Sequence, residues 1–164
     1  MTMHESCRGL GYARGRRPDL HAAGGHPAAK SAPAACASCG AICVHGRWAW
    51  GRAVAGMAVV TCPACVRIRD RVAAHVLELA GDLGPCWNEI RGLIGNVERA
   101  ELEDHPLERV MPIEVRDDRV FVPTTGLHLA RRIAAAIVRR WRRGVRLQFT
   151  EPSTRIEWLP GSGR

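Results

Sequence analysis

Aromatic residues and lysine are scarce in this chain of 164 residues. It contains one Tyr, two Phe and five Trp, and Lys30 is the single lysine among 24 basic residues. An excess of arginine can reflect phosphate binding, because the guanidinium group binds phosphate bidentately. The chain is also rich in Ala and Gly, however, so GC-rich coding explains the ratio of arginine to lysine. The positions of the arginines, rather than their excess, therefore carry the information about function.

Long apolar runs are also missing. No stretch approaches the roughly 20 apolar residues that cross a bilayer, and the basic N-terminus lacks the apolar segment of a signal peptide. We therefore expect a cytoplasmic protein that spans no membrane. In that compartment the seven cysteines are expected to be metal ligands or free thiols rather than disulfides.

The residue patterns of common enzyme classes are absent from the sequence too. It contains no recognisable Ser/His/Asp set, pair of catalytic carboxylates or phosphate-binding P-loop. The adjacent Asp117 and Asp118 are typical of a hairpin turn. The sequence therefore predicts a protein that is not an enzyme and has no small-molecule substrate.

Positive charge is concentrated at the two ends of the sequence. Residues 1–35 hold five basic and two acidic residues, a net charge of +3. Residues 36–104 hold seven basic and eight acidic residues, a net charge of −1. Residues 105–164 hold twelve basic and six acidic residues, a net charge of +6, which brings the total to +8. The first 35 residues lack any sustained hydrophobic period and are rich in Gly, Pro and Ala, which predicts a disordered basic arm.

Two cysteine pairs give the most specific signal in the chain. Cys36 and Cys39 form one CxxC pair, and Cys62 and Cys65 form the second. Four thiolates at this spacing favour one tetrahedral Zn²⁺. Gly40 after the first pair permits the tight knuckle turn. Since four protein ligands leave no position for water or substrate, we predict a structural zinc ribbon.

Other chemistries for the cysteines stay open. Iron, as a rubredoxin-type centre or an iron–sulfur cluster, also takes four cysteine ligands. Cys43 or His45 can replace one ligand of the four, and Cys86 lies at a predicted helix start, where the pKa of a thiol can fall. A thiol-based redox sensor that uses Cys43 or Cys86 is the corresponding, less favoured function.

The hydrophobic pattern predicts an α+β fold. The expected segments are a disordered basic arm (1–35), a four-cysteine ribbon (36–65), a helix over 66–80 with a connector to 85, an α+β domain (86–159) and a tail (160–164). Between the cysteine pairs, the ribbon alternates enough for a hairpin, with turns available at Gly51 and Gly56.

The α+β domain is expected to be an αββαββ two-layer unit. Its first helix covers 86–104, and two strands follow around Asp117–Asp118. A second helix runs from about 126 to 142, with Thr124 or Thr125 as its N-cap, and two further strands surround 151–153.

The second helix is the candidate nucleic-acid interface. From Thr124 to Thr150 the sequence has seven arginines and no acidic residue, so nothing local neutralises the charge. The predicted phosphate-binding residues are His128, Arg131, Arg132, Arg139, Arg140, Arg142, Arg143 and Arg146. An acidic partner within the fold, the stretch Glu98–Asp104, is an alternative, and so is an anionic membrane surface. Trp48 and Trp50 of the ribbon can stack on bases unless they pack inside it.

Three stretches resemble a family of small bacterial zinc-ribbon proteins found mainly in proteobacteria: CASCG to CPACVRIRD, EDHPLERVMPIEV and VPTTGLHLARRIAAAI. The resemblance covers about residues 36–159. It implies that the four cysteines are ligands and that Thr124–Thr125, His128 and Arg131–Arg132 form a signature helix. More distantly, the cysteine pairs and FTEPSTRIEW are similar to the N-terminal zinc region of the nonsense-mediated-decay-3 family, adaptors of the large ribosomal subunit.

These observations predict a non-enzymatic zinc-ribbon protein that binds RNA or the ribosome through the arginine face. The alternative is a protein-interaction or regulatory zinc module, in which the acidic helix 86–104 and the basic helix dock to partner proteins.

Overall fold

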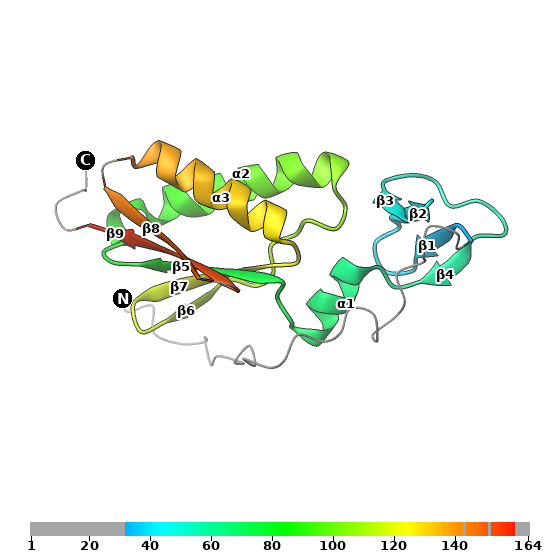
Figure 1. Ribbon diagram of the computed structural model, residues 1–164, viewed down its shortest axis with the longest axis horizontal. Helices are drawn as coiled ribbons and strands as arrows, with labels where there is room; N and C mark the ends of the chain where they lie inside the picture. The colour runs from blue at the N-terminus through cyan, green and yellow to red at the C-terminus, as the bar shows by residue number, and fades with distance from the viewer. Residues whose placement is uncertain (1–31, 143, 151, 160–164) are drawn as a thin grey trace, which may run out of the picture.

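The computed structural model describes residues 32–142, 144–150 and 152–159. The tail 160–164, Arg143 and most of the predicted disordered arm lie outside the described residues. The end of that arm was placed wrongly, since Ala34 and Ala35 belong to the first strand, where Ala34 is buried. The described residues form three α-helices and two β-sheets, which confirms a mixed α+β protein (Figure 1).

The first sheet contains the cysteines and has four three-residue strands in the order β3-β2-β1-β4. These are β1 (Ala34–Cys36), β2 (Ile42–Val44), β3 (Arg47–Ala49) and β4 (Ala58–Val60). A hairpin does lie between the cysteine pairs, but the turns predicted for it at Gly51 and Gly56 are wrong, because β3 and β4 do not pair. The hairpin joins β2 to β3 through His45 and Gly46, whose φ angles of 51° and 76° suit a two-residue turn.

The helix predicted over 66–80 exists only as far as residue 70, and the assignment of its second half is wrong. Helix α1 (Pro63–Asp70) ends where Arg71 adopts the left-handed conformation, and residues 75–80 form strand β5 (His75–Ala80). Leu77 and Leu79 are buried while Glu78 between them is only partly covered, which is the alternation of a strand. The connector assigned to 66–85 therefore contains a strand of the second sheet.

The second sheet has five strands in the order β6-β7-β5-β9-β8. The remaining strands are β6 (Glu114–Arg116), β7 (Arg119–Thr124), β8 (Val145–Thr150) and β9 (Ser153–Trp158). The turn at Asp117–Asp118 is confirmed, with φ angles of 46° and 60°. The expected αββαββ order follows β5, which lies at the centre, antiparallel to β7 and parallel to β9. The unit is therefore βαββαββ.

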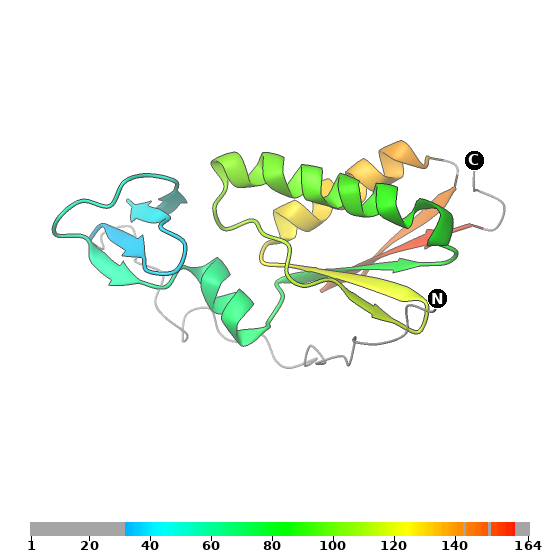
Figure 2. The same ribbon diagram turned by 180° about the vertical axis from the view of Figure 1, so that it is seen from behind.

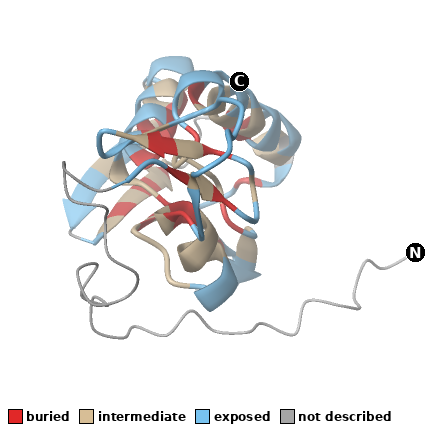
Figure 3. Ribbon diagram, turned by 90° about the vertical axis from the view of Figure 1, so that its right-hand side faces the viewer, coloured by how far each residue is buried: buried red, intermediate tan, exposed pale blue. Residues whose placement is uncertain are grey.

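Two helices cover one face of this sheet. The short 3-10 helix η1 (Gly84–Cys86) leads into α2 (Trp87–Asp104), and α3 (Leu127–Arg140) lies beside it (Figure 2). The core between the two layers includes Leu77, Ile90, Ile133 and Ile156, and Figure 3 shows the buried residues gathered between helices and sheet. Helix α3 ends two residues before the predicted end. None of the described helices combines the length and apolar character needed to cross a membrane.

The opposite face of the sheet carries paired charges. Glu78 on β5 accepts a hydrogen bond from Arg119 of β7 at 2.9 Å and lies 3.8 Å from Arg155 of β9. The end of the sheet where β5 begins and β7 ends lies toward the ribbon, and α1 joins the two regions (Figure 1). The end of α2 and the start of α3 therefore lie on the ribbon side.

Candidate metal centre

The four predicted ligands come together where β1 meets α1. Cys36 ends β1, Cys39 lies in the following turn, Cys62 is the N-cap of α1, and Cys65 is in its first turn. Their sulfur atoms all lie within 4.8 Å of one another. The 3.7 Å between Cys39 Sγ and Cys62 Sγ is close to the roughly 3.8 Å edge of a tetrahedron whose metal–sulfur bonds are about 2.3 Å long. The cluster can hold a metal ion such as zinc.

Backbone amides turn toward the sulfurs. The N–H of Cys62 donates to Cys36 Sγ at 3.2 Å, and the N–H of Cys65 donates to Cys62 Sγ at 3.4 Å. Burial alone would raise the pKa of Cys36, but hydrogen bonds from the amides of Cys62, Cys39 and Ser38 outweigh it and lower the pKa to about 6. Burial raises the pKa of both Cys62 and Cys65. The site thus holds one ready thiolate and two thiols whose protons a metal must displace.

An arginine from the α+β unit reaches this cluster, and the sequence analysis missed it. Arg109 Nη1 donates to Cys65 Sγ at 3.7 Å, and its Nε donates to the carbonyl of Pro106 at 2.9 Å. Burial would lower the pKa of Arg109, but its interactions with the neighbouring cysteine sulfurs, that of Cys39 first, outweigh burial and raise the pKa. Four thiolates and Zn²⁺ carry a net charge of −2, so a guanidinium group fits beside them. The one feature of the sequence that could have indicated Arg109 is its position in the segment HPLERV.

The alternative ligands lie elsewhere. Cys43 is buried in β2, His45 is in the hairpin turn, and neither belongs to the group of four sulfurs. Cys86 lies at the start of α2, whereas the ribbon faces the end of that helix. Burial raises the pKa of the Cys43 and Cys86 thiols, which makes each a poorer nucleophile at neutral pH.

Both ribbon tryptophans make contacts inside the molecule. Trp48 packs against the cysteine cluster together with Leu107 of the α+β unit. Trp50 Nε1 donates to the carbonyl of Leu102 at the end of α2, and the Arg109 guanidinium lies 5.8 Å from the Trp50 ring centre. Trp48 is therefore committed to packing. Trp50 keeps 41% of its surface exposed.

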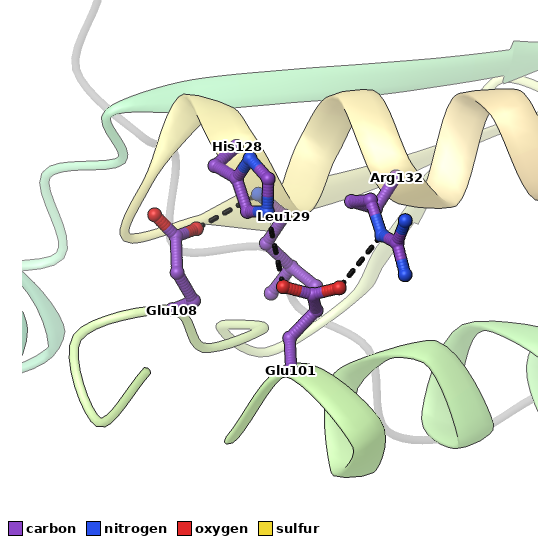
Figure 4. A network of polar contacts seen from close by, with 5 residues as sticks. All are labelled: Glu101, Glu108, His128, Leu129 and Arg132. Carbon is purple, nitrogen blue, oxygen red and sulfur yellow. Dashed lines mark hydrogen bonds and ion pairs between the residues drawn. The ribbon is translucent and has the colours of Figure 1, made fainter. Parts of the chain in front are cut away.

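Acidic residues of α2 neutralise part of the predicted arginine face. Arg132 Nε lies 2.6 Å from Glu101 Oε1, and His128 Nε2 lies 3.0 Å from Glu101 Oε2 (Figure 4). Arg140 Nε lies 2.6 Å from Glu89 Oε1. Three of the predicted phosphate-binding residues, His128, Arg132 and Arg140, therefore have an acidic partner within the fold. Glu101 belongs to the stretch Glu98–Asp104 that was considered for this role, but Glu89 lies outside it.

The other predicted phosphate-binding residues differ among themselves. Arg146 Nη1 is 3.7 Å from Glu157 Oε2 on β9. Arg131, Arg139 and Arg142 are exposed, and within the described part of the chain no acidic side chain forms an ion pair with them. Arg143 lies outside that part. A stripe of three arginines therefore keeps its charge unpaired. We call these three residues the arginine stripe.

Helix α3 starts differently from the prediction. Its N-cap is Gly126, and neither threonine caps it. Glu108 Oε2 instead accepts a hydrogen bond from the N–H of Leu129 at 2.8 Å, so a carboxylate lies at the positive end of the helix (Figure 4). Thr125 Oγ1 donates to the Leu107 carbonyl at 2.6 Å and accepts from the N–H of Arg109 at 2.8 Å.

The segments HPLERV and TTGLHLARR are therefore in contact with each other, at the end of the α+β unit that faces the ribbon. No protein-family model, curated protein or solved structure matches this chain.

Proposed function

We propose that this protein is a non-enzymatic zinc-ribbon factor that binds RNA, with the ribosome as the particle to test first. One structural Zn²⁺ held by Cys36, Cys39, Cys62 and Cys65 stabilises the ribbon. The arginine stripe contacts RNA phosphates. The observation that carries the proposal is that, within the described part of the chain, Arg131 and Arg139 on α3 and Arg142 just after it form no ion pair, whereas Arg132 and Arg140 do.

The placement of the stripe supports contact with a polyanion. Arg131 and Arg139 are eight residues apart, which corresponds to about 12 Å along a helix, and Arg142 follows the helix end. No acidic side chain of the described residues neutralises these three guanidinium groups, and an external chain of phosphates would do so. A surface of mixed charge is already neutralised by its own ion pairs, whereas the arginine stripe is neutralised only when it binds an external polyanion.

The same helix is poorly suited to a membrane surface. Insertion requires an exposed apolar face. Leu129, Ile133 and Ile137 of α3 are fully buried against the sheet. RNA uses the cationic side of α3 without disturbing this core.

An exposed aromatic side chain on the helix-covered side of the sheet offers a stacking surface. On β8, Leu147 pairs with the core residue Ile156, so Phe149 lies on the helix-covered side of the sheet. Phe149 is nevertheless 67% exposed, because it lies on the edge strand. Exposed aromatic rings of this kind stack on unpaired bases. We therefore propose that Phe149, rather than Trp48 or Trp50, stacks on a base.

RNA binding is tested by fluorescence anisotropy with labelled ribosomal RNA fragments over a range of salt concentrations. The variant Arg131→Gln, Arg139→Gln, Arg142→Gln should bind weakly, with a salt slope smaller by about 2, because three phosphate contacts are lost. The matched control removes three other exposed charges, in Arg47→Gln, Arg52→Gln, Arg91→Gln. Equal affinities and slopes for the two triple variants would refute the stripe as the RNA-binding surface.

The cellular form of the test is sedimentation of a lysate through a sucrose gradient. We expect the protein to travel with ribosomal subunits, and the stripe variant to stay at the top of the gradient while the control variant sediments. A wild-type chain found only in the top fractions would argue against the ribosome, though not against another RNA.

A second candidate function, a protein-interaction module, is favoured by the outer strand of the ribbon. β4 pairs with β1 on one side only, and all three of its residues are exposed. Val59 is 78% exposed and Val54 in the preceding loop 62%. An exposed edge with apolar side chains can accept an extended peptide as a further strand. In that case Val59→Lys should abolish capture of the partner, whereas the stripe variant should retain it.

A further inference from the structure

A second group of metal-ligating side chains lies outside the cysteine cluster. Glu101 and His105 are four residues apart at the end of α2, and His128 is in the first turn of α3. One carboxylate oxygen and one ring nitrogen from each histidine lie within 4.8 Å of one another. Glu101 Oε2 and His128 Nε2 are already 3.0 Å apart.

The surroundings of the group resemble a prepared site. Glu101 is only 7% exposed, so its side chain is held by the surrounding protein, whereas both histidines are exposed to solvent. The two imidazole rings are 5.9 Å apart, edge to face at 74°. The other oxygen of Glu101 is held by Arg132 at 2.6 Å, the kind of outer contact that orients a metal-binding carboxylate.

A surface cavity adjoins the group. It has a volume of about 370 Å³, and His105, His128, Glu108 and Trp48 are among its lining residues. Both histidines thus border the same space, between the ribbon and the start of α3. A metal held by three side chains would have an open coordination position, and this cavity is large enough for water or a small ligand to occupy it.

We propose that Glu101, His105 and His128 form a second metal site, which takes a divalent first-row transition ion of the zinc, cobalt and nickel class. Two imidazole nitrogens and one carboxylate oxygen are a ligand set for such ions, and they differ in kind from the four thiolates nearby. Zn²⁺ with bonds of about 2.0–2.1 Å separates tetrahedral ligand atoms by about 3.3 Å. The Glu101–His128 pair, 3.0 Å apart, has to open only slightly to reach this spacing, and rotation of the exposed His105 ring brings its nitrogen from within 4.8 Å to the same distance.

The charges of the neighbouring groups are compatible with a cation. Arg132 is the nearby positive group, and it lies on the oxygen of Glu101 that the metal does not use. Glu108 lines the same cavity and adds a negative charge. Bound metal replaces the hydrogen bond between Glu101 and His128 and joins the end of α2 to the start of α3.

The test uses the full chain with the cysteine cluster first filled with one equivalent of Zn²⁺. Co²⁺ is then added, and its visible absorption reports the ligands, because a nitrogen-and-oxygen site lacks the sulfur-to-cobalt charge-transfer band of a thiolate site. We expect one further equivalent of Co²⁺ with a spectrum of the nitrogen-and-oxygen type. His105→Gln and His128→Gln should each weaken it about tenfold or more, because loss of a ligand exceeds loss of an outer contact.

Controls separate this site from other histidines and from misfolding. His45→Asn lies in the ribbon turn, tolerates the left-handed backbone there and should leave the second equivalent intact. His4, His21 and His26 are present in every variant, so their contribution cancels. Circular dichroism checks the fold of each variant. Unchanged stoichiometry and spectrum in both His→Gln variants, or a second equivalent bound by thiolates, would overturn the proposal.

Discussion

The ribbon and the α+β unit hold themselves together by different means. Among the described residues, the cluster around the cysteines has three buried members, Cys36, Cys62 and Ala64, and the strands of the ribbon are three residues long. The core of the α+β unit has fourteen buried apolar residues between two helices and five strands. The ribbon buries too little apolar surface to fold without help, whereas the α+β unit does not need it.

The two regions therefore depend on different residues for their structure. In the ribbon, the cysteines decide the structure, and most neighbouring side chains are exposed. In the α+β unit the apolar pattern decides it. Arg109, Leu107 and Trp50 connect the two, so each region can be weakened separately while the other serves as an internal control.

Metal removal should have the largest effect. A chelator, or Cys62→Ser, should unfold residues 34–60 and leave the α+β unit folded, because structural zinc sites contribute roughly 10–16 kcal/mol of apparent binding free energy. Hydrogen exchange followed by mass spectrometry measures protection in each region. Cys43→Ala is the matched control, since Cys43 is buried in the ribbon but is not in the metal cluster. Loss of protection in both regions at once would contradict independent stabilisation.

Acid should release the metal before it affects the core. The pKa values of Cys62 and Cys65 are raised, so both thiols are protonated at neutral pH in the metal-free chain, while Cys36 with a pKa of about 6 is largely a thiolate above that pH. Zinc must displace at least the two protons, so its affinity should rise with pH and fall by about 100-fold per unit as pH is lowered. Calorimetric titration in two buffers of different ionisation enthalpy counts the protons. A pH-independent affinity between pH 6 and 8 would disprove this coupling.

A cavity in the core should affect only the α+β unit. Ile133 is fully buried, and Ile133→Ala should lower the free energy of unfolding by about 2–5 kcal/mol. The zinc content should stay unchanged, because no cysteine ligand touches this core. Urea denaturation followed by circular dichroism, with metal analysis of the same sample, measures both quantities. Val59→Ala on the exposed side of the ribbon is the control, with an expected change below about 0.5 kcal/mol.

The parts of the structure that depend on local sequence could be predicted from it. The cysteine pairs lie close in sequence to their turns, so their spacing was sufficient to find the cluster. The Asp117–Asp118 turn and helices α2 and α3 were found for the same reason. Strand β5 was missed because Val72, Val76 and Leu79 have helical spacing while His75, Leu77 and Leu79 alternate, and only the neighbouring strands β7 and β9 settle the choice.

The parts that depend on distant residues could not be predicted. Arg132 is paired with Glu101, thirty-one residues earlier, and Glu108 caps a helix that begins nineteen residues later. No local pattern indicates which arginines of α3 meet an acid on α2. The arginine stripe consists of the arginines that found no acidic partner among the described residues when the chain folded. The sequence shows all the arginines of this region but does not show which of them are paired.

Arg109 tests the connection between the two regions. Arg109→Gln removes the charge that lies beside the cysteine sulfurs and the hydrogen bond to Pro106, at an expected cost of about 1–3 kcal/mol in ribbon stability. All four thiolates remain, so the protein should still bind one zinc but lose it faster to a chelator. Stopped-flow mixing with a coloured chelator gives the rate. Arg47→Gln, an exposed change in the ribbon, should leave the rate as it is, and equal rates for all three proteins would show that Arg109 does not hold the site.

The smallest effect is expected at the start of α3. Glu108→Gln keeps an oxygen that can accept the hydrogen bond from Leu129 but removes the negative charge at the helix N-terminus, which should cost about 0.3–1 kcal/mol. Gly126→Ala should cost more, because a β-carbon there would collide with the Glu108 carboxylate. If that collision is the cause, combining Gly126→Ala with Glu108→Ala should cost less than the sum of the two single changes, as urea midpoints can measure. Additive costs would mean that Gly126 matters for a reason other than contact with the Glu108 carboxylate.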